Sequence, residues 1–525
     1  MSGALAGMPD TEWHPSVNPW LIAAAVMMAT FMEVLDTTIT SVALPNMAGS
    51  LASTNEEATW VLTSYLVANA VVLPASGWFS LRFGRKRFLL ACTALFTFAS
   101  FLCALAPSMP ILILARILQG AGGGALQPIS QAILLESFPR EKQGMAMAMF
   151  GLGVVGAPII GPFLGGWLTD NYSWRWVFNI NIPIGILAVY LIARFVEDPP
   201  YIKSARPGTI DKIGFGLLTV WLASLQIVLD KGQQEDWFAS SWIAWFSVIS
   251  VTALVFLIAR ELRTPEPIVN LRVFRDRNFW VGTAMTTVIF AGMYSALTML
   301  PLFLQTLLGY TSQSAGLATA PRGIGAMIAM PVVGVLMTYV DSRWLMSLGV
   351  ACIAASTLLL GNVTLDVAMA SIVWPNVLYG LGMGLVMVPL MTVSIGTLAK
   401  EKIGNASGIF NLMRNLGGSI GISVSTTYLA RMTQAHQVNL VSHLTPYEPV
   451  FRQRLAGITA GLSRYSAGPQ VRMQAYGMLH GMLLQQANLK AYVDMFCWTA
   501  LIMAVCLPGV WLLKRVVAKG SVALH

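Results

Sequence analysis

The sequence predicts an all-α integral membrane protein. Of its 525 residues 56% are hydrophobic and only 10% are charged, and the mean hydropathy is +0.67. A water-soluble domain of this length would not stay in solution with that balance. Apolar segments recur along most of the chain, each about as long as a helix that crosses a bilayer. We therefore expect a polytopic protein whose helices span the membrane.

Fourteen such segments follow one another, so both ends of the chain should lie on the same side. The polar stretch 1–19 lacks the basic region and cleavage site of a signal peptide, and we expect it to be a short tail. The expected spans, in order, are about 20–42, 58–80, 88–106, 109–132, 144–168, 175–195, 211–229, 241–260, 280–304, 314–338, 344–362, 371–398, 403–425 and 492–514.

The basic residues predict the orientation of these spans. Loops on the side of the two ends hold 21 Lys and Arg, whereas the short loops on the opposite side hold two, Arg175 and Lys231. Because positively charged loops stay in the cytoplasm, both ends should be cytoplasmic and the first helix should run outward. This distribution accounts for the net charge of +9 and argues against nucleic-acid binding.

The first span carries two carboxylates near its middle, Glu33 and Asp36. Their i, i+3 spacing puts them on one helix face, where an acid is costly unless it meets a partner or water. The fourth span places Arg116 deep in the membrane. A guanidinium stays charged there, because it does not lose a proton in proteins. We predict that Arg116 pairs with Asp36 or Glu33 at a functional site. The alternative is a buried ion pair that only holds helices together.

The connection between the second and third spans reads GWFSLRFGRKR. Gly77 and Gly84 permit a tight turn, and Arg85 and Lys86 are two of four basic residues that should anchor it at the cytoplasmic face. We expect this segment to form part of a gate.

The fifth span is unusually rich in Gly and Pro. Proline removes a backbone donor and bends a helix, and glycines four residues apart allow a neighbouring backbone to approach. We therefore predict a bendable, tightly packed hinge helix, formed around Gly156, Pro158, Gly161, Pro162, Gly165 and Gly166.

Five motifs together resemble the major facilitator superfamily: LDTTITSVALP (35–45), GWFSLRFGRKR, LILARILQGAGGG (112–124), GAPIIGPFLGGWL (156–168) and WRWVFNINIPIG (174–185). More narrowly, the chain is similar to the fourteen-helix drug:proton antiporters, and most to their EmrB type. The resemblance implies a first six-helix bundle at 20–196, two inserted helices at 197–262, and a second bundle formed by 263–425 and 491–525, with a long loop at 426–490.

The family resemblance also implies a function. It predicts export of lipophilic drugs and other toxic compounds across the bacterial inner membrane, driven by a proton gradient with no cofactor. Asp36 would be the coupling carboxylate, with Arg116 and Glu33 beside it. Arg322, Gln119, Gln127 and Asn69 are expected to line the substrate cavity, and Arg414 to serve in packing or gating. Two departures from the family pattern are Leu81, where relatives usually have an acid, and Glu33, which lies outside the first-helix signature.

The loop at 426–490 contains segments with apolar residues at helical spacing, so we expect amphipathic helices there. In the EmrB type a periplasmic adaptor and an outer-membrane channel complete the export path. The apolar residues of this loop favour an adaptor as its partner, and a lid over the outer mouth is the alternative.

Other functions are disfavoured by the sequence. GGSIG (417–421) matches a nucleophile elbow, but it lies in an apolar span with no preceding strand, so no enzyme is expected. No Lys follows a Gly, which excludes the phosphate-binding loop of an ATP-driven pump. The five cysteines lack metal-ligand spacing, so no metal site is expected. A transporter for a specific metabolite or siderophore, or a sensor that acts through the long loop, stays open.

Overall fold

The computed structural model describes residues 15–139, 142–200, 202, 211–265, 267–442, 444–445, 447–463 and 470–514. Within these ranges every regular element is a helix, and thirteen helical segments are long and apolar enough to cross a membrane. The predicted fold class, an all-α membrane protein, is confirmed. Most of the expected tail at 1–19, and residues 515–525 at the other end, lie outside the described residues.

The first group of helices corresponds to the first six expected spans. The fourth span is divided at Gly124 and Ala125, and the sixth begins with a separate short turn. The helices are α1 (Pro19–Ser50), α2 (Asn55–Phe83), α3 (Arg85–Leu105), α4 (Met109–Gly123), α5 (Leu126–Ser137), α6 (Gln143–Asn171), α7 (Trp176–Asn179) and α8 (Asn181–Phe195).

Local capping fixes where the first two of these helices begin. The side chain of Asn18 accepts a hydrogen bond from the backbone N–H of Trp20 at the start of α1. At the start of α2, Thr54 and Glu57 exchange side-chain and backbone hydrogen bonds in a capping box. Such caps satisfy backbone donors that a helix leaves free at its N-terminus.

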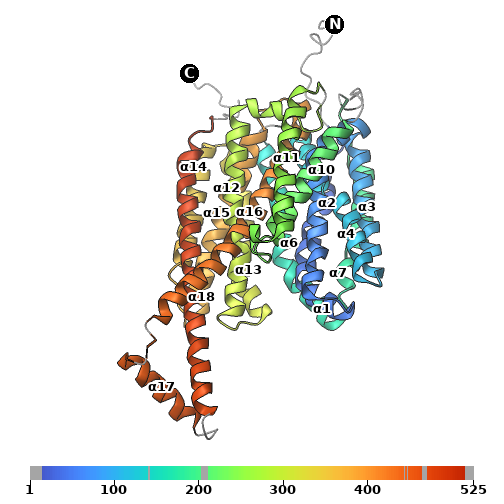
Figure 1. Cartoon of the computed structure of the whole chain (residues 1–525). Helices are drawn as coiled ribbons and strands as arrows, with labels where there is room; N and C mark the ends of the chain where they lie inside the picture. Colours follow the sequence, from blue (N-terminus) through green and yellow to red (C-terminus); the bar gives the residue numbers. More distant parts are fainter. Residues whose placement is uncertain are drawn as a thin grey trace, which may run out of the picture.

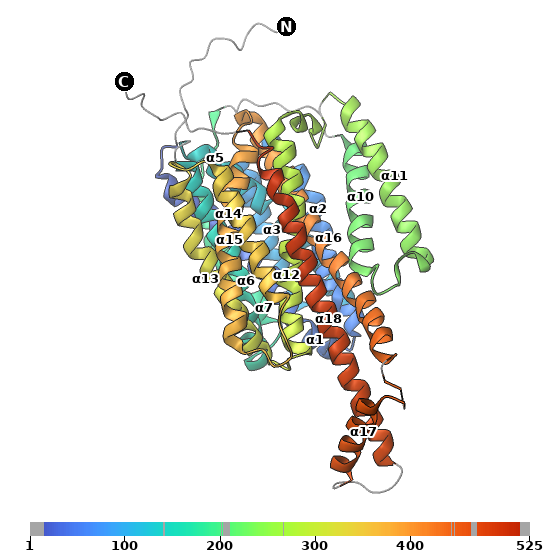
Figure 2. The same cartoon turned by 90° about the vertical axis from the view of Figure 1, so that its left-hand side faces the viewer.

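Two inserted helices stand beside the rest of the molecule. They are α10 (Lys212–Lys231) and α11 (Ser241–Arg263), joined through the short η2 (Trp237–Ala239). α10 packs on α2 and α16, whereas α11 lies at the rim (Figure 2). Side chains such as Val251, Val255 and Phe256 are about 60% exposed, which suits a helix that faces lipid.

The second group of helices follows the inserted pair. It comprises η3 (Leu271–Arg275), α12 (Arg277–Thr306), α13 (Ser312–Leu336), α14 (Ser342–Leu360), α15 (Met369–Ile395), α16 (Lys400–Val441), α17 (Pro449–Leu462) and α18 (Gln470–Val510). α16 contains the expected span 403–425 but is not one of the thirteen apolar segments. It nevertheless packs against α12, α18 and α2, so its polar residues lie among helices.

The segment expected as a long loop with amphipathic helices is mostly helical. α16 continues past residue 425 to Val441, and α18 begins at Gln470, before the expected span. With α17 these extensions form an arm, residues 426–441, 449–462 and 470–490, that projects beyond the other helices (Figures 1 and 2). Thr433 donates to Asn488 (2.9 Å) and His436 contacts Asp494 (2.7 Å), which joins α16 to α18 at the base of the arm.

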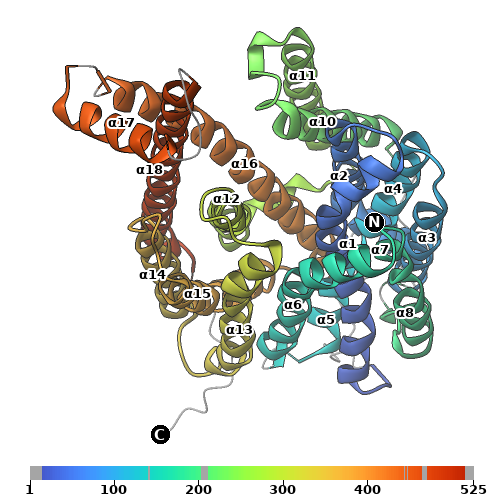
Figure 3. The same ribbon diagram turned by 90° about the horizontal axis from the view of Figure 1, so that it is seen from below.

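The two groups of helices meet at the end opposite the arm. α2 packs on α16 and α6 packs on α13. A Cβ added to Gly77 in α2 would lie 2.7 Å from the Cα of Asn405 in α16, so this approach requires glycine. At the contact between α6 and α13, Gly144 of α6 faces Gly334 of α13. Viewed from the end that carries the arm, the first and second groups lie on opposite sides of the molecule (Figure 3).

Candidate functional site

Asp36 and Arg116 form a buried ion pair between α1 and α4. Nη1 of Arg116 lies 2.5 Å from Oδ2 of Asp36, and both side chains are fully buried. Nε of Arg116 donates to the backbone carbonyl of Val61 (3.0 Å), and the guanidinium stacks 4.2 Å from the ring centre of Tyr65. Of the two partners that the sequence allowed for Arg116, the structure selects Asp36.

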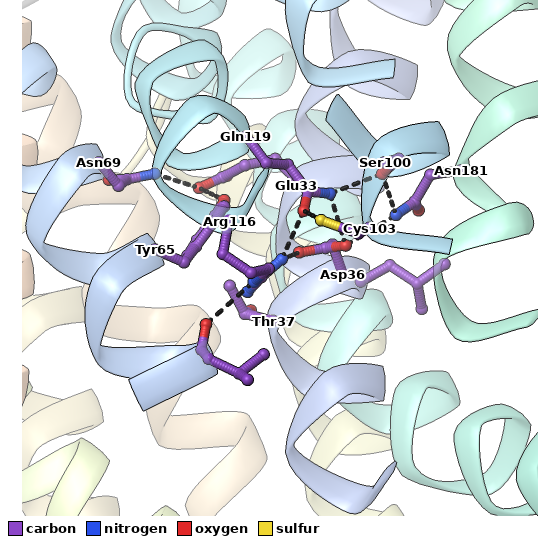
Figure 4. Close-up of polar contacts among 12 residues, drawn as sticks. Glu33, Asp36, Thr37, Tyr65, Asn69, Ser100, Cys103, Arg116, Gln119 and Asn181 are labelled. Carbon is purple, nitrogen blue, oxygen red and sulfur yellow. Dashed lines mark hydrogen bonds and ion pairs between the residues drawn. The ribbon is translucent and has the colours of Figure 1, made fainter. Parts of the chain in front are cut away.

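The second oxygen of Asp36 is held by two amides. Nε2 of Gln119 donates to Oδ1 at 2.9 Å and Nδ2 of Asn181 donates to it at 2.7 Å. The hydroxyl of Ser100 accepts from both amides, at 2.6 and 3.1 Å. Figure 4 shows these side chains converging on the carboxylate. Since an ionised carboxylate only accepts hydrogen bonds, this set of donors suits the charged form of Asp36.

Two members of this cluster did not emerge from the sequence. Asn181 lies at the start of α8 within the motif WRWVFNINIPIG, and Ser100 lies in α3. Neutral polar side chains inside apolar spans are common, so only its place in the quoted motif could have drawn attention to Asn181. Gln119, expected in a substrate cavity, lies fully buried in the Asp36 cluster.

Glu33 occupies a separate polar cluster one helical turn from Asp36. It accepts hydrogen bonds from Gln127 (2.5 Å), Asn69 (3.1 Å) and the hydroxyl of Tyr65 (3.4 Å). Its side chain is buried, and no cation among the described residues forms an ion pair with it. Because the Tyr65 ring also stacks on Arg116, this one tyrosine contacts both clusters.

Arg414 connects the Glu33 cluster to the second group of helices. Its Nη2 donates to Oε1 of Gln127, whose amide nitrogen donates to Glu33. The chain of contacts therefore runs from α1 through α5 to α16. Arg414 is buried, and its Nε and Nη1 have no hydrogen-bond partner within the described structure.

Arg322 forms a third polar centre, between α13 and α15. Its Nε donates to Oδ1 of Asn376 (3.1 Å), and its guanidinium stacks 4.2 Å from the ring centre of Tyr379. The side chain is buried, and neither Nη atom has a hydrogen-bond partner among the described residues. A buried guanidinium without an anion is costly, so Arg322 can bind an incoming acceptor.

The predicted gate segment lies where α2 meets α3. Gly84 has a φ of +87°, and a Cβ there would lie 2.8 Å from Asp198, so the turn requires glycine. The backbone N–H of Lys86 donates to Asp198 (2.8 Å). Arg85 is buried and paired with Glu136 at the end of α5. A carboxylate of α5 and one in the segment after α8 therefore hold this turn. Leu81 stands just before it, at the position where the family pattern has an acid.

The predicted hinge glycines divide into two sets. Gly161 and Gly165 of α6 pack directly on α1 at Thr38 and Ile39, two and three residues after Asp36. Gly156 and Gly166 have no neighbour within 4 Å of an added Cβ. Pro158 lies within α6, and the side chain of Pro162 is outside the described part of the structure.

Residues 26–422 match the model of the Major Facilitator Superfamily. The chain belongs to the major facilitator superfamily. It is 35% identical to the fatty acid resistance protein FarB of Neisseria gonorrhoeae, over 95% of this chain and 97% of FarB. It is 38% identical to the multidrug export protein EmrB of Haemophilus influenzae, over 82% and 84% of the two chains.

Solved structures of this superfamily share the fold. A double-Trp mutant of XylE has a TM-score of 0.60 at 15% identity, with 95% of this chain and 97% of that chain covered. The human organic anion transporter MFSD10 has a TM-score of 0.59 at 14% identity, with 93% and 100% covered. The superfamily predicted from the sequence motifs is confirmed, and the chain is a multi-pass membrane transporter.

Proposed function

We propose that this transporter is a proton-coupled antiporter that exports lipophilic toxic compounds across the bacterial inner membrane, with both ends in the cytoplasm. The observation that carries the proposal is the buried Asp36–Arg116 ion pair. An ionisable pair inside membrane helices is expensive and is expected where protons or substrates move. The named functions of the relatives, multidrug export and fatty acid resistance, support export.

Protonation of Asp36 is the proposed coupling step. A proton that arrives from the outer side neutralises the carboxylate, which ends its charge attraction to Arg116. The α1 segment that carries Asp36 packs on Gly161 and Gly165 of α6, so a shift of α1 there displaces the glycine-rich helix. The two groups of helices then rock about the centre and expose the site to the cytoplasm.

Glu33 and Arg414 link this step to the second group of helices. The amide of Gln127 donates to Glu33 and accepts from Arg414. A neutral Glu33 binds the amide less strongly than a charged one, so the protonation state of Glu33 changes how firmly α5 is tied to α16. The energy comes from the proton gradient, and the proposal needs no resident cofactor.

Arg322 is the proposed subsite for an acidic group of the substrate. Its two Nη atoms are buried and have no hydrogen-bond partner among the described residues. An anion is the ligand that offsets the cost of burying this charge. The apolar body of the substrate would lie against aromatic and Met side chains such as Tyr379, which stacks on Arg322.

Arg322→Gln should weaken binding of a long-chain fatty acid anion by about tenfold to a hundredfold, because a charged hydrogen bond of about 1.5–3 kcal/mol is lost. Binding of a lipophilic cationic dye should not weaken. Equilibrium binding to the purified protein measures both, with Arg194→Gln, an exposed arginine, as control. Equal losses of affinity for the anion and the dye would show that Arg322 does not form an anion subsite.

The arm is the proposed contact for a periplasmic adaptor, which with an outer-membrane channel would complete the path. Large apolar side chains are exposed on it, among them Val438 (71%), Val450 (75%) and Met473 (74%). Such residues on a water-facing element favour a protein partner.

Replacing residues 440–485 by a short Gly-Ser linker should preserve transport by the isolated protein and abolish co-purification of an adaptor. The Thr433–Asn488 and His436–Asp494 contacts at the base of the arm lie outside the deletion and should keep α16 beside α18. Vesicle transport and affinity purification from membranes are the two measurements. Loss of transport, together with no adaptor bound to the intact protein, would indicate that the arm is a lid.

Transport in proteoliposomes tests the proposed function as a whole. With inverted orientation and an acid interior, the substrate should accumulate inside in exchange for protons. Collapse of the gradient with an ionophore should stop that accumulation. Flux that continues unchanged without a gradient would identify a facilitator for a specific metabolite instead.

A further inference from the structure

A cavity of ≈ 560 Å³ lies where α11 meets η3. It is far from the Asp36 cluster in sequence and belongs to none of the three polar centres described above. Its lining combines three apolar residues with two arginines, namely Leu262, Leu271, Arg272, Phe274 and Arg275.

The apolar part of the cavity continues onto a lipid-facing surface. Leu262, in the last turn of α11, is 56% exposed, and the exposed side chains of Val255 and Phe256 precede it on the same helix. α11 stands at the rim of the molecule (Figure 2). A hydrocarbon chain that lies along α11 can therefore reach the cavity without leaving the bilayer.

The polar part of the cavity is positively charged. Arg272 and Arg275 are exposed on η3, and no acidic side chain among the described residues forms an ion pair with either. Two acids among the described residues are already engaged elsewhere. Asp211 pairs with Arg260 (2.9 Å), and Asp276 caps α12 through its side chain.

Glu261 does not neutralise the cavity either. It is buried at 1% exposure and accepts a hydrogen bond from the backbone N–H of Val269 (3.3 Å). It therefore points into the packing between α11 and the segment that leads to η3, and Arg263 adds a further exposed cation beside it.

We propose that this cavity binds an anionic phospholipid of the cytoplasmic leaflet. The headgroup phosphate would accept from Arg272 and Arg275, and one acyl chain would lie against Leu262 and the outer face of α11. Basic pockets between helices on the cytoplasmic side of a membrane protein bind acidic lipid headgroups. Because η3 leads directly into α12, the lipid would tie the inserted helices to the start of the second group. The choice of the cytoplasmic leaflet rests on the proposed orientation of the chain, whereas the lipid site is independent of the transported substrate.

Lipid retention by the purified protein tests the site. Native mass spectrometry should detect bound phosphatidylglycerol in preference to phosphatidylcholine. The double substitution Arg272→Gln and Arg275→Gln should lower the affinity for phosphatidylglycerol roughly tenfold to thirtyfold, as expected for the loss of two basic residues near the membrane surface. The matched control, Arg194→Gln with Lys402→Gln, removes two exposed charges from helix ends outside the cavity and should leave that affinity unchanged.

The apolar contact is tested by Leu262→Asn, which keeps both arginines. It should weaken binding of phosphatidylglycerol and leave binding of glycerol phosphate unaffected. The lipid site is refuted if the protein retains the two lipids equally, or if the control variant loses as much affinity as the double substitution. It is also refuted if glycerol phosphate competes at the same concentration as the lipid, which would identify a site for free phosphate.

Discussion

Asp36→Asn should abolish proton-driven export while substrate binding persists. The asparagine keeps the size of the side chain and one acceptor oxygen for Gln119 and Asn181, but it cannot be protonated in the working pH range. Its interaction with Arg116 also loses the charge attraction. Proton-coupled flux should therefore fall to the level of empty vesicles. The expected decrease is on the order of a hundredfold or more, because an obligatory step is lost.

The measurement is substrate flux in proteoliposomes beside equilibrium binding of the same substrate. Asp170→Asn is the matched control, because Asp170 is exposed near the end of α6 and the substitution removes the same charge. Full gradient-driven export by the Asp36→Asn protein would refute the coupling assignment.

Arg116→Ala should be the most destabilising single change in the site. It leaves Asp36 fully buried without its cation and frees the carbonyl of Val61. Breaking a buried ion pair from one side costs about 3–5 kcal/mol. Thermal unfolding in detergent should show a clear drop in midpoint relative to wild type and to Arg194→Ala, an exposed arginine on α8.

A double variant separates the charge effect from lost packing. Arg116→Ala combined with Asp36→Asn removes the unpaired charge, so it should unfold at a higher temperature than Arg116→Ala alone. If the single variant unfolds at the wild-type temperature, the ion pair contributes little to the packing of α1 on α4.

The central ion pair could be predicted because charge in a membrane is expensive. Asp36 and Arg116 each stand out in an apolar span, and the cost of leaving either alone requires a nearby partner. Asn181 and Ser100 could not be found in the same way, since an amide or hydroxyl inside a helix carries no comparable penalty and has many possible partners. Gln119 was expected elsewhere for the same reason.

The helices inside the membrane were predicted more accurately than those outside it. Hydropathy marks a span by its apolar residues, so it places the end of a span where polar residues begin. In α16 and α18 the helix continues past that point, because the two helices contact each other through pairs such as Thr433–Asn488. Tertiary contacts of this kind are not visible as periodicity in either segment alone.

Because α16 and α18 continue without a break into the arm, the arm can act as a lever. Each helix leaves the membrane as a stiff rod, and at 1.5 Å per residue the α18 part of the arm is roughly 30 Å long. A rotation of the second group by about 10° would swing such a lever by about 5 Å at its tip. A protein bound at the tip of the arm would therefore be displaced each time the transporter changes between its inward-open and outward-open states.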